Sequence, residues 1–125
     1  MDTPSLVGIV ADDDFAVLYL AVTLLRMGGY EVLPARDGGE ALQLLEQHRS
    51  HVRFLITDLQ MPIMDGIELA RIVRTRFPTV GVVLMSGGAI PDNASVGAHA
   101  LLHKPFTSAT LVESVRNALA AIGRD

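Results

Sequence analysis

Short apolar runs alternate along this chain with longer segments whose apolar residues recur every three or four positions. Each run has the length of a β-strand, and together they predict five strands, at residues 6–11, 30–33, 54–57, 80–85 and 100–103. The periodic segments predict helices at 15–27, from Asp37 to about His48, from Asp65 to about Arg76, and along the face Leu111, Val115, Ala118 and Ile122. Strands and helices therefore alternate over nearly the whole chain.

The ends of the predicted helices carry recognisable signals. Asp37 and Asp65 are each followed three residues later by a glutamate, a pattern that caps the first turn of a helix. The segment 90–97 predicts only a weak helix or a loop, because Pro91, Gly97 and the glycine pair before them oppose helix formation.

The strand runs show little polar–apolar alternation, as expected when helices cover both faces of a sheet. Strands that alternate with helices and connect by right-handed crossovers form an open parallel sheet. We therefore predict an α/β fold, a doubly wound (βα)5 unit. Its five-stranded parallel sheet has the flavodoxin-like strand order 2-1-3-4-5.

Composition narrows the class of protein. At 125 residues the chain predicts a single domain over 1–125, and 50% hydrophobic with 19% charged residues indicates a globular fold. There is no cysteine, no apolar run of about 18 residues, and no basic segment at the N-terminus. The net charge is −4 and the basic residues are scattered. We expect a cytoplasmic protein with no membrane segment and no direct binding of nucleic acid by this chain.

Polar residues end four of the predicted strands. Asp12 and Asp13 follow the first, Asp58 the third, Ser86 the fourth and Lys104 the fifth. The carboxyl ends of parallel strands meet at one edge of the sheet, where such folds bind ligands. Clustered carboxylates repel one another, and a hard cation such as Mg²⁺ relieves that repulsion. A carboxylate beside Mg²⁺ can act as a nucleophile toward phosphorus and form an aspartyl phosphate.

Lys104 is the only lysine, since the other nine basic side chains are arginine. An ammonium on a flexible stem can follow first a carboxylate and then a phosphoryl oxygen, whereas a guanidinium is a rigid fork. Its place at a strand end, before Pro105, favours a role in the site. A compositional bias toward arginine with one surviving lysine is the alternative.

Four segments together resemble the receiver domain of two-component response regulators of the CheY type. They read VADDD, ITDLQMPIMDG, LMSG and GAHALLHKPF, at residues 10–14, 56–66, 84–87 and 97–106. The segments GGYEV and DGGEAL, at 28–32 and 37–42, fit the same family. The resemblance runs from about residue 5 to residue 121, and the order and spacing of the segments make it specific.

The resemblance implies a signalling phosphoprotein more than an ordinary enzyme. Asp58 would accept the phosphoryl group, while Asp12, Asp13, Asp58 and the backbone carbonyl of Gln60 would hold Mg²⁺. Ser86 and Lys104 would contact the phosphoryl oxygens, and Lys104 would precede a cis peptide bond. The donor would be a histidine kinase or a histidine phosphotransfer protein. The domain would promote its own phosphorylation and its slow dephosphorylation.

One position departs from the family pattern. Receivers usually carry tyrosine or phenylalanine three residues before the lysine, and this chain has Leu101. Leucine cannot make the inward aromatic swing that couples the phosphosite to the usual output face. A phosphate-independent interaction module and a phosphorelay intermediate of a larger hybrid kinase therefore stay open as alternatives. An aspartyl phosphatase is disfavoured, because such enzymes usually need an acid where Gln60 stands.

Several residues near the motifs carry simpler interpretations. Asp14 is expected to be a solvated neighbour of the site or a first-turn helix cap, and Asp65 a helix cap. The four histidines are expected at the surface, and Met61, Met64 and Met85 in packing or loop positions. The segment 15–27 is unusually apolar for a surface helix. Its outer face either binds a kinase or a second copy of the chain, as in a homodimer, or is made polar enough by Ala16, Ala21 and Thr23.

Overall fold

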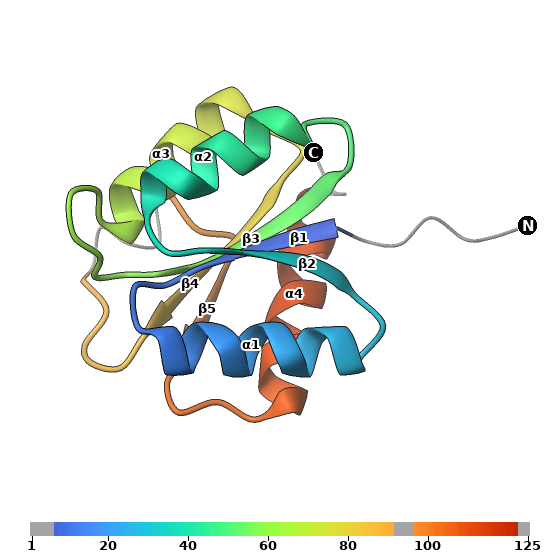
Figure 1. The fold of residues 1–125 in the computed structure, drawn as a ribbon, viewed down its shortest axis with the longest axis vertical. Helices are drawn as coiled ribbons and strands as arrows, with labels where there is room; N and C mark the ends of the chain where they lie inside the picture. Colours follow the sequence, from blue (N-terminus) through green and yellow to red (C-terminus); the bar gives the residue numbers. More distant parts are fainter. Residues whose placement is uncertain (1–6, 92–96, 123–125) are drawn as a thin grey trace, which may run out of the picture.

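A parallel sheet between two layers of helices forms the molecule (Figure 1). The computed structural model describes residues 7–91 and 97–122. Its elements, in chain order, are β1 (Val7–Ala11), α1 (Phe15–Met27), β2 (Glu31–Ala35), α2 (Gly38–Gln47), β3 (Val52–Asp58), α3 (Gly66–Arg76), β4 (Gly81–Ser86), β5 (Ala100–His103) and α4 (Ser108–Ile122). No helix within the described ranges is long and apolar enough to cross a membrane.

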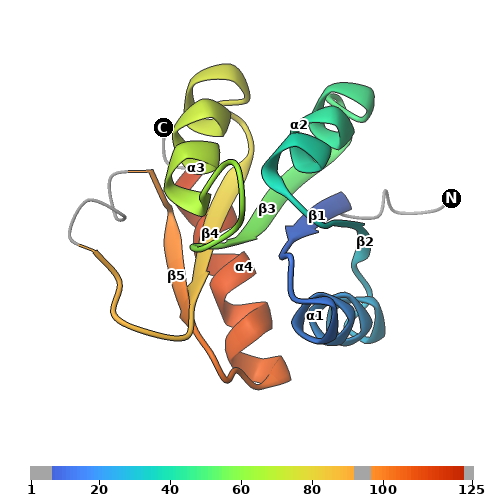
Figure 2. The same ribbon diagram turned by 60° about the vertical axis from the view of Figure 1, so that its left-hand side comes forward.

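The strand order is β2-β1-β3-β4-β5, and every neighbouring pair is parallel. The predicted fold and strand order are therefore confirmed. Figure 2 shows β2 and β5 at opposite edges of the sheet, with β1, β3 and β4 between them. In the register of the central pair Ala11 lies beside Thr57, so the residues that follow them, Asp12 and Asp58, are brought to the same edge.

Each face of the sheet is covered by its own pair of helices, α1 with α4 on one side and α2 with α3 on the other (Figure 1). On the first side α1 and α4 bury apolar side chains against Val10, Phe54 and Ile56. On the second side α2 and α3 do so against Ile9 and Leu55. Burial on both faces explains the continuous apolar runs of the central strands.

The strand limits differ slightly from those predicted. β2 extends to Ala35 and β3 begins at Val52, because backbone pairing with β1 continues past the apolar runs. Pro34 is tolerated in β2 because that strand lies at an edge. The weak helix or loop expected at 90–97 falls largely on residues 92–96, which lie outside the described residues.

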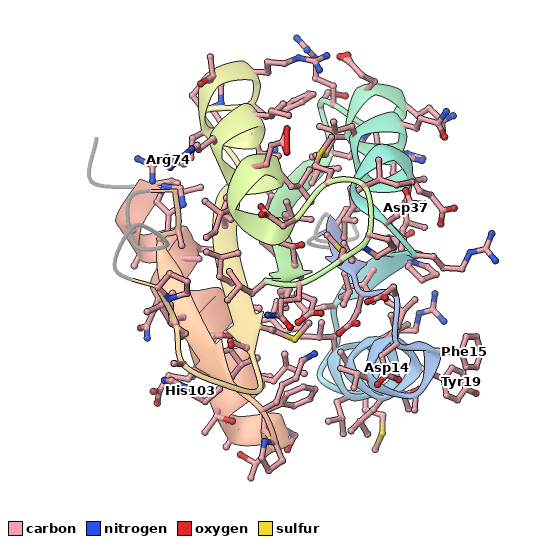
Figure 3. All side chains as sticks on the ribbon, turned by 90° about the vertical axis from the view of Figure 1, so that its left-hand side faces the viewer. Asp14, Phe15, Tyr19, Asp37, Arg74 and His103 are labelled. Carbon is pink, nitrogen blue, oxygen red and sulfur yellow. The ribbon has the colours of Figure 1, made fainter. Side chains whose placement is uncertain are left out.

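The outer face of α1 is apolar. Ala21 is fully buried, so the interpretation that placed it on the outer side of the helix is wrong. The exposed side chains include Phe15 at 71%, Tyr19 at 64% and Leu20 at 49% exposure. The rings of Phe15 and Tyr19 stack with their centroids 6.0 Å apart, and Figure 3 shows both projecting outward from the helix. Of the three residues expected to make this face polar, Ala21 therefore contributes nothing to it.

Candidate functional site

Three carboxylates meet at the edge where the strands end. One oxygen each from Asp12, Asp13 and Asp58 lies within 4.8 Å of the others. Asp12 is fully buried and Asp58 nearly so, while Asp13 is exposed. The backbone N–H of Asp12 donates to Ala35 at 3.1 Å, which continues the β1–β2 pairing past the strand end. The acids that lie 45 residues or more apart in the sequence are thus gathered by strand pairing.

Asp14, the third acid of the run, has a different role. Its carboxylate accepts hydrogen bonds from the N–H groups of Ala16 and Val17 at the start of α1. Its own N–H donates to Oδ1 of Asp12 at 2.9 Å. The predicted cap is confirmed, and Asp65 caps α3 in the same way.

Lys104 points into the acid cluster. Its Nζ lies 3.0 Å from Oδ2 of Asp12 and 2.9 Å from Oδ1 of Asp58. Its backbone N–H donates to the carbonyl of Ser86 at 2.8 Å, which ties the end of β5 to the end of β4. The peptide bond from Lys104 to Pro105 is cis, as the family resemblance implied. Three carboxylates and one ammonium leave two negative charges unmatched.

Burial and pairing shift two pKa values in this cluster. Burial raises the pKa of Asp12 above its ordinary value, and the hydrogen bonds from Asp14 and Lys104 only partly oppose this effect. Burial alone would lower the pKa of Lys104, but the hydrogen bonds and charges of Asp58 and Asp12 outweigh it and raise that pKa. The ammonium is therefore firmly charged, and the ionised Asp12 carboxylate is held at a cost.

A cavity of about 310 Å³ opens beside Asp58 and is lined in part by Gln60, Ser86, Gly87 and Lys104. The Ser86 hydroxyl donates to the carbonyl of Gly88 and accepts from its N–H, both at 3.2 Å. All the predicted site residues are thus brought to one cavity or its acidic border. Ser86 is held by its own loop and not by the acids.

The loop between β3 and α3 leaves no room for a side chain at Gly66. A side chain there would collide with the carbonyl oxygen of Asp58, so only glycine lets α3 begin this close to the strand end. The Gly66 N–H also donates to the carbonyl of Leu59 at 2.8 Å. The position of the Asp58 backbone therefore depends on this close approach.

Two features were not predicted, Ile63 in the site region and His99 at the opposite end of β4 and β5. Ile63, in the loop after Asp58, has a φ of 72° and a side chain that is 98% exposed. No sequence signal marks this, because isoleucine disfavours such a backbone conformation. His99 is half-buried, and its Nδ1 accepts the Val82 N–H at 2.9 Å, so the surface position predicted for it is wrong.

The donor set fits Mg²⁺. All the acidic ligands are carboxylate oxygens, which hard divalent cations prefer, and the described residues contain no cysteine. A cation would offset the unmatched negative charge of the cluster. The arrangement can therefore hold a cation, present a carboxylate nucleophile and supply an ammonium beside it.

The chain matches the family model for the response regulator receiver domain over residues 9–116. It belongs to the receiver domains of response regulators. Receiver domains act in two-component signalling and are not classical enzymes, and they generally use Mg²⁺ at an acidic cluster. The earlier identification from the four sequence segments is confirmed.

Similar proteins agree with this assignment. The receiver domain is 34% identical over 112 residues to the transcriptional regulatory protein PrrA of Mycobacterium tuberculosis, covering 86% of this chain and 47% of PrrA. It is 32% identical over 118 residues to the sensor kinase CckA of Brucella abortus, covering 89% of this chain but 12% of CckA. The chain thus spans about half the length of PrrA and a small part of CckA.

Solved structures show the same fold. A receiver domain from Clostridium thermocellum superposes with a TM-score of 0.84 at 30% identity, covering 91% of this chain and 94% of that one. The chemotaxis protein CheY4 of Vibrio cholerae superposes with a TM-score of 0.84 at 28% identity, covering 92% and 99%. Both match nearly the whole length of this receiver domain.

Proposed function

We propose that this receiver domain is a phosphorylation-controlled switch that accepts a phosphoryl group on Asp58. The observation that carries the proposal is the Lys104 ammonium, held 2.9 Å from Asp58 and 3.0 Å from Asp12 inside a group of three acids. A lysine on the open surface would contact solvent, whereas Lys104 contacts two carboxylates of the cluster. An ammonium beside a carboxylate nucleophile is suited to receive the oxygens of an arriving phosphoryl group.

The donor is a histidine kinase or a histidine phosphotransfer protein that carries phosphohistidine. An oxygen of the Asp58 carboxylate attacks the phosphorus, and the phosphorus–nitrogen bond of the donor breaks. The electron pair of that bond stays on the imidazole nitrogen. Slow attack by water on the aspartyl phosphate later releases inorganic phosphate and restores the Asp58 carboxylate.

Asp12, Asp13, Asp58 and the backbone carbonyl of Gln60 are the groups that would hold Mg²⁺. When bound, the cation supplies positive charge against the acids and the transferred phosphoryl group. Lys104 keeps its contact with Asp58 and takes one phosphoryl oxygen. Ser86 must release the hydrogen bond that it donates to the Gly88 carbonyl before its hydroxyl can donate to a phosphoryl oxygen.

This chain differs from the family pattern at Leu101, the position of the aromatic residue that usually couples the phosphosite to the output face. This side chain lies on β5 opposite Leu84 and is 41% exposed. Passing the phosphoryl group on to another protein needs no aromatic swing. The likeness to part of the sensor kinase CckA favours this phosphorelay role as a second candidate. We place the domain in the cytoplasm, without direct nucleic-acid binding.

Incubation with acetyl phosphate and Mg²⁺, followed by intact-mass measurement, tests the proposal. We expect the mass to increase by one phosphoryl group in the wild-type chain and in Asp14→Asn. We expect no increase in Asp58→Asn or without Mg²⁺. A phosphoryl group retained in Asp58→Asn would place the acceptor elsewhere. No labelling of the wild type, with no binding of Mg²⁺, would support a phosphate-independent interaction module instead.

A further inference from the structure

Few polar side chains are buried in the described part of the chain, and one of them has no role in the site as described above. The buried polar or charged residues are Asp12, Thr57, Asp58, Ser86 and Ser114. Asp12, Asp58 and Ser86 belong to the site, and the Ser114 hydroxyl donates to a carbonyl of its own helix. Thr57 remains, fully buried and directly before the proposed phosphoacceptor.

The hydroxyl of Thr57 is not needed for packing. Thr57 pairs with Ala11 of β1 on one side and with Leu84 of β4 on the other, so its neighbours in the sheet are apolar. Valine has the same branched shape and would bury no polar group. Burying a hydroxyl costs free energy unless it has a hydrogen-bond partner. What distinguishes threonine from valine at this position is the bond that its hydroxyl makes.

The Thr57 hydroxyl donates to the backbone carbonyl of the phosphoacceptor itself. Its Oγ1 lies 3.1 Å from the Asp58 carbonyl oxygen in a buried hydrogen bond. Ala11 and Thr57 are the last pair between β1 and β3, and the Leu59 N–H donates to the Met85 carbonyl of β4 at 2.9 Å. The Asp58 carbonyl thus lies where β3 leaves its pairing with β1, and the Thr57 hydroxyl gives it a donor there.

The surroundings of the Asp58 carbonyl are tightly packed. A side chain at Gly66 would collide with this carbonyl oxygen, so the first turn of α3 lies directly against it. Sδ of Met61, further along the same loop, lies 3.9 Å from the Thr57 hydroxyl oxygen. The hydroxyl is therefore in contact with both the start and the middle of the loop that follows Asp58.

Loss of the hydroxyl would leave the Asp58 carbonyl without this donor. An unpaired buried carbonyl costs free energy, so the peptide group after Asp58 would turn toward water or another donor. That turn would shift the Asp58 carboxylate, now 2.9 Å from the Lys104 ammonium, and the backbone carbonyl of Gln60. Small displacements of reacting groups slow a reaction strongly, because the groups must meet at short distance and in the correct orientation.

We propose that Thr57 is a positioning residue for phosphorylation of Asp58. It does not touch the reacting atoms. Through its hydrogen bond to the Asp58 carbonyl it fixes the direction of the Asp58 side chain and the path of the loop that carries the Gln60 carbonyl. The proposal rests on the proposed function of Asp58 as acceptor and of the acid cluster as a Mg²⁺ site.

The test separates the hydroxyl of Thr57 from its shape. Thr57→Val removes the hydroxyl and keeps the shape, whereas Thr57→Ser keeps the hydroxyl. Thr75→Val is the matched control, because the Thr75 hydroxyl also donates to a backbone carbonyl at 3.1 Å but lies exposed on α3. The rate of Asp58 labelling by acetyl phosphate is measured by intact mass. The Kd for Mg²⁺ is measured from its effect on thermal unfolding, and unfolding in a chelator reports the stability of each variant.

We expect Thr57→Val to slow labelling by about tenfold and to raise the Kd for Mg²⁺ severalfold, as for loss of a residue that orients metal ligands. Thr57→Ser should restore most of both, and Thr75→Val should change neither. A valine variant that only unfolds at a lower temperature, with rate and Kd unchanged, would overturn the inference. A serine variant as slow as valine would also overturn it, because packing of the methyl group would then be the cause.

Failure of the proposed function gives a different result. If acetyl phosphate does not label the wild type at Asp58, that function fails. A Kd for Mg²⁺ that still rises in Thr57→Val and recovers in Thr57→Ser would then support Thr57 as a positioning residue of the metal site alone. A Kd that is the same in all three proteins would overturn the inference as well.

Discussion

At the scale of one residue, Asp12 shows how clustering and burying acids reduces the free energy of unfolding. It is fully buried, and one of its oxygens lies within 4.8 Å of oxygens of Asp13 and Asp58. The backbone N–H of Asp14 and the ammonium of Lys104 stabilise its ionised form. Burial raises its pKa above the ordinary 3.8. An acid with a raised pKa binds its proton more tightly in the folded state than in the unfolded state. The ionised carboxylate therefore opposes folding at neutral pH.

We expect Asp12→Asn to raise the unfolding temperature of the metal-free chain at neutral pH, because the amide removes the cost of a buried charge and still accepts from Lys104. The gain should shrink as the pH falls through the raised pKa of Asp12, and disappear below the ordinary value of 3.8, where the carboxyl is protonated in both states. Thermal unfolding of both proteins in a chelator, followed by circular dichroism across this range, measures it. A lower unfolding temperature for the variant at neutral pH would mean that pairing with Lys104 outweighs burial.

At the scale of elements, α1 has one face packed against the sheet and one exposed apolar face. Leu18, Ala21, Val22 and Leu25 pack against the sheet, while Phe15, Tyr19, Leu20 and Met27 are exposed. Arg26 is the only charged side chain within the helix, so the outer face has little to keep it hydrated. Large exposed apolar patches mark interaction sites in many proteins, so this face is tested by substitution.

We expect Tyr19→Ser and Leu20→Ser to leave the fold intact and to weaken association. Both side chains are already exposed, so their loss removes little internal packing, whereas loss of an aromatic anchor from an interface weakens binding by about fivefold or more. Thr23→Ser on the same exposed face is the matched control. Affinity for the phosphodonor and sedimentation of the chain alone distinguish the two partners. If neither changes, the face is not a binding surface.

The elements were predictable where local sequence and global fold agree. Apolar runs buried on both faces predicted the strands, and aspartates three residues before glutamates predicted two helix starts. Ala21 was misplaced because alanine is common on both faces of a helix, and only packing decides its side. The conformation of Ile63 could not be predicted from the sequence for a similar reason. Positive φ there belongs to the turn that the Met64 N–H closes on the carbonyl of Pro62, and it opposes the preference of isoleucine itself.

At the scale of the whole molecule, the site exists only when the sheet is complete. Asp12 and Asp13 follow β1, Asp58 ends β3 and Lys104 follows β5. Because β3 and β4 lie between β1 and β5 in the sheet, the first acid meets the ammonium only when these four strands have paired. The membership of this site was predictable because parallel strands end at one edge. The two hydrogen bonds between Ser86 and Gly88 could not be predicted, because they depend on the backbone path of Gly87 and Gly88.

A ligand of this site therefore stabilises the entire domain. We expect Mg²⁺ to raise the free energy of unfolding by about 2.7 kcal/mol at 100 times its Kd, because the separated acids of the unfolded chain hold it poorly. Asp13→Asn should abolish most of this response. Asp14→Asn should keep the full response to Mg²⁺ and nearly the full starting stability, because asparagine caps a helix about as well as aspartate. Urea unfolding with increasing Mg²⁺, followed by circular dichroism, measures each case. A response that survives in Asp13→Asn would mean that the cation binds outside the three-acid cluster.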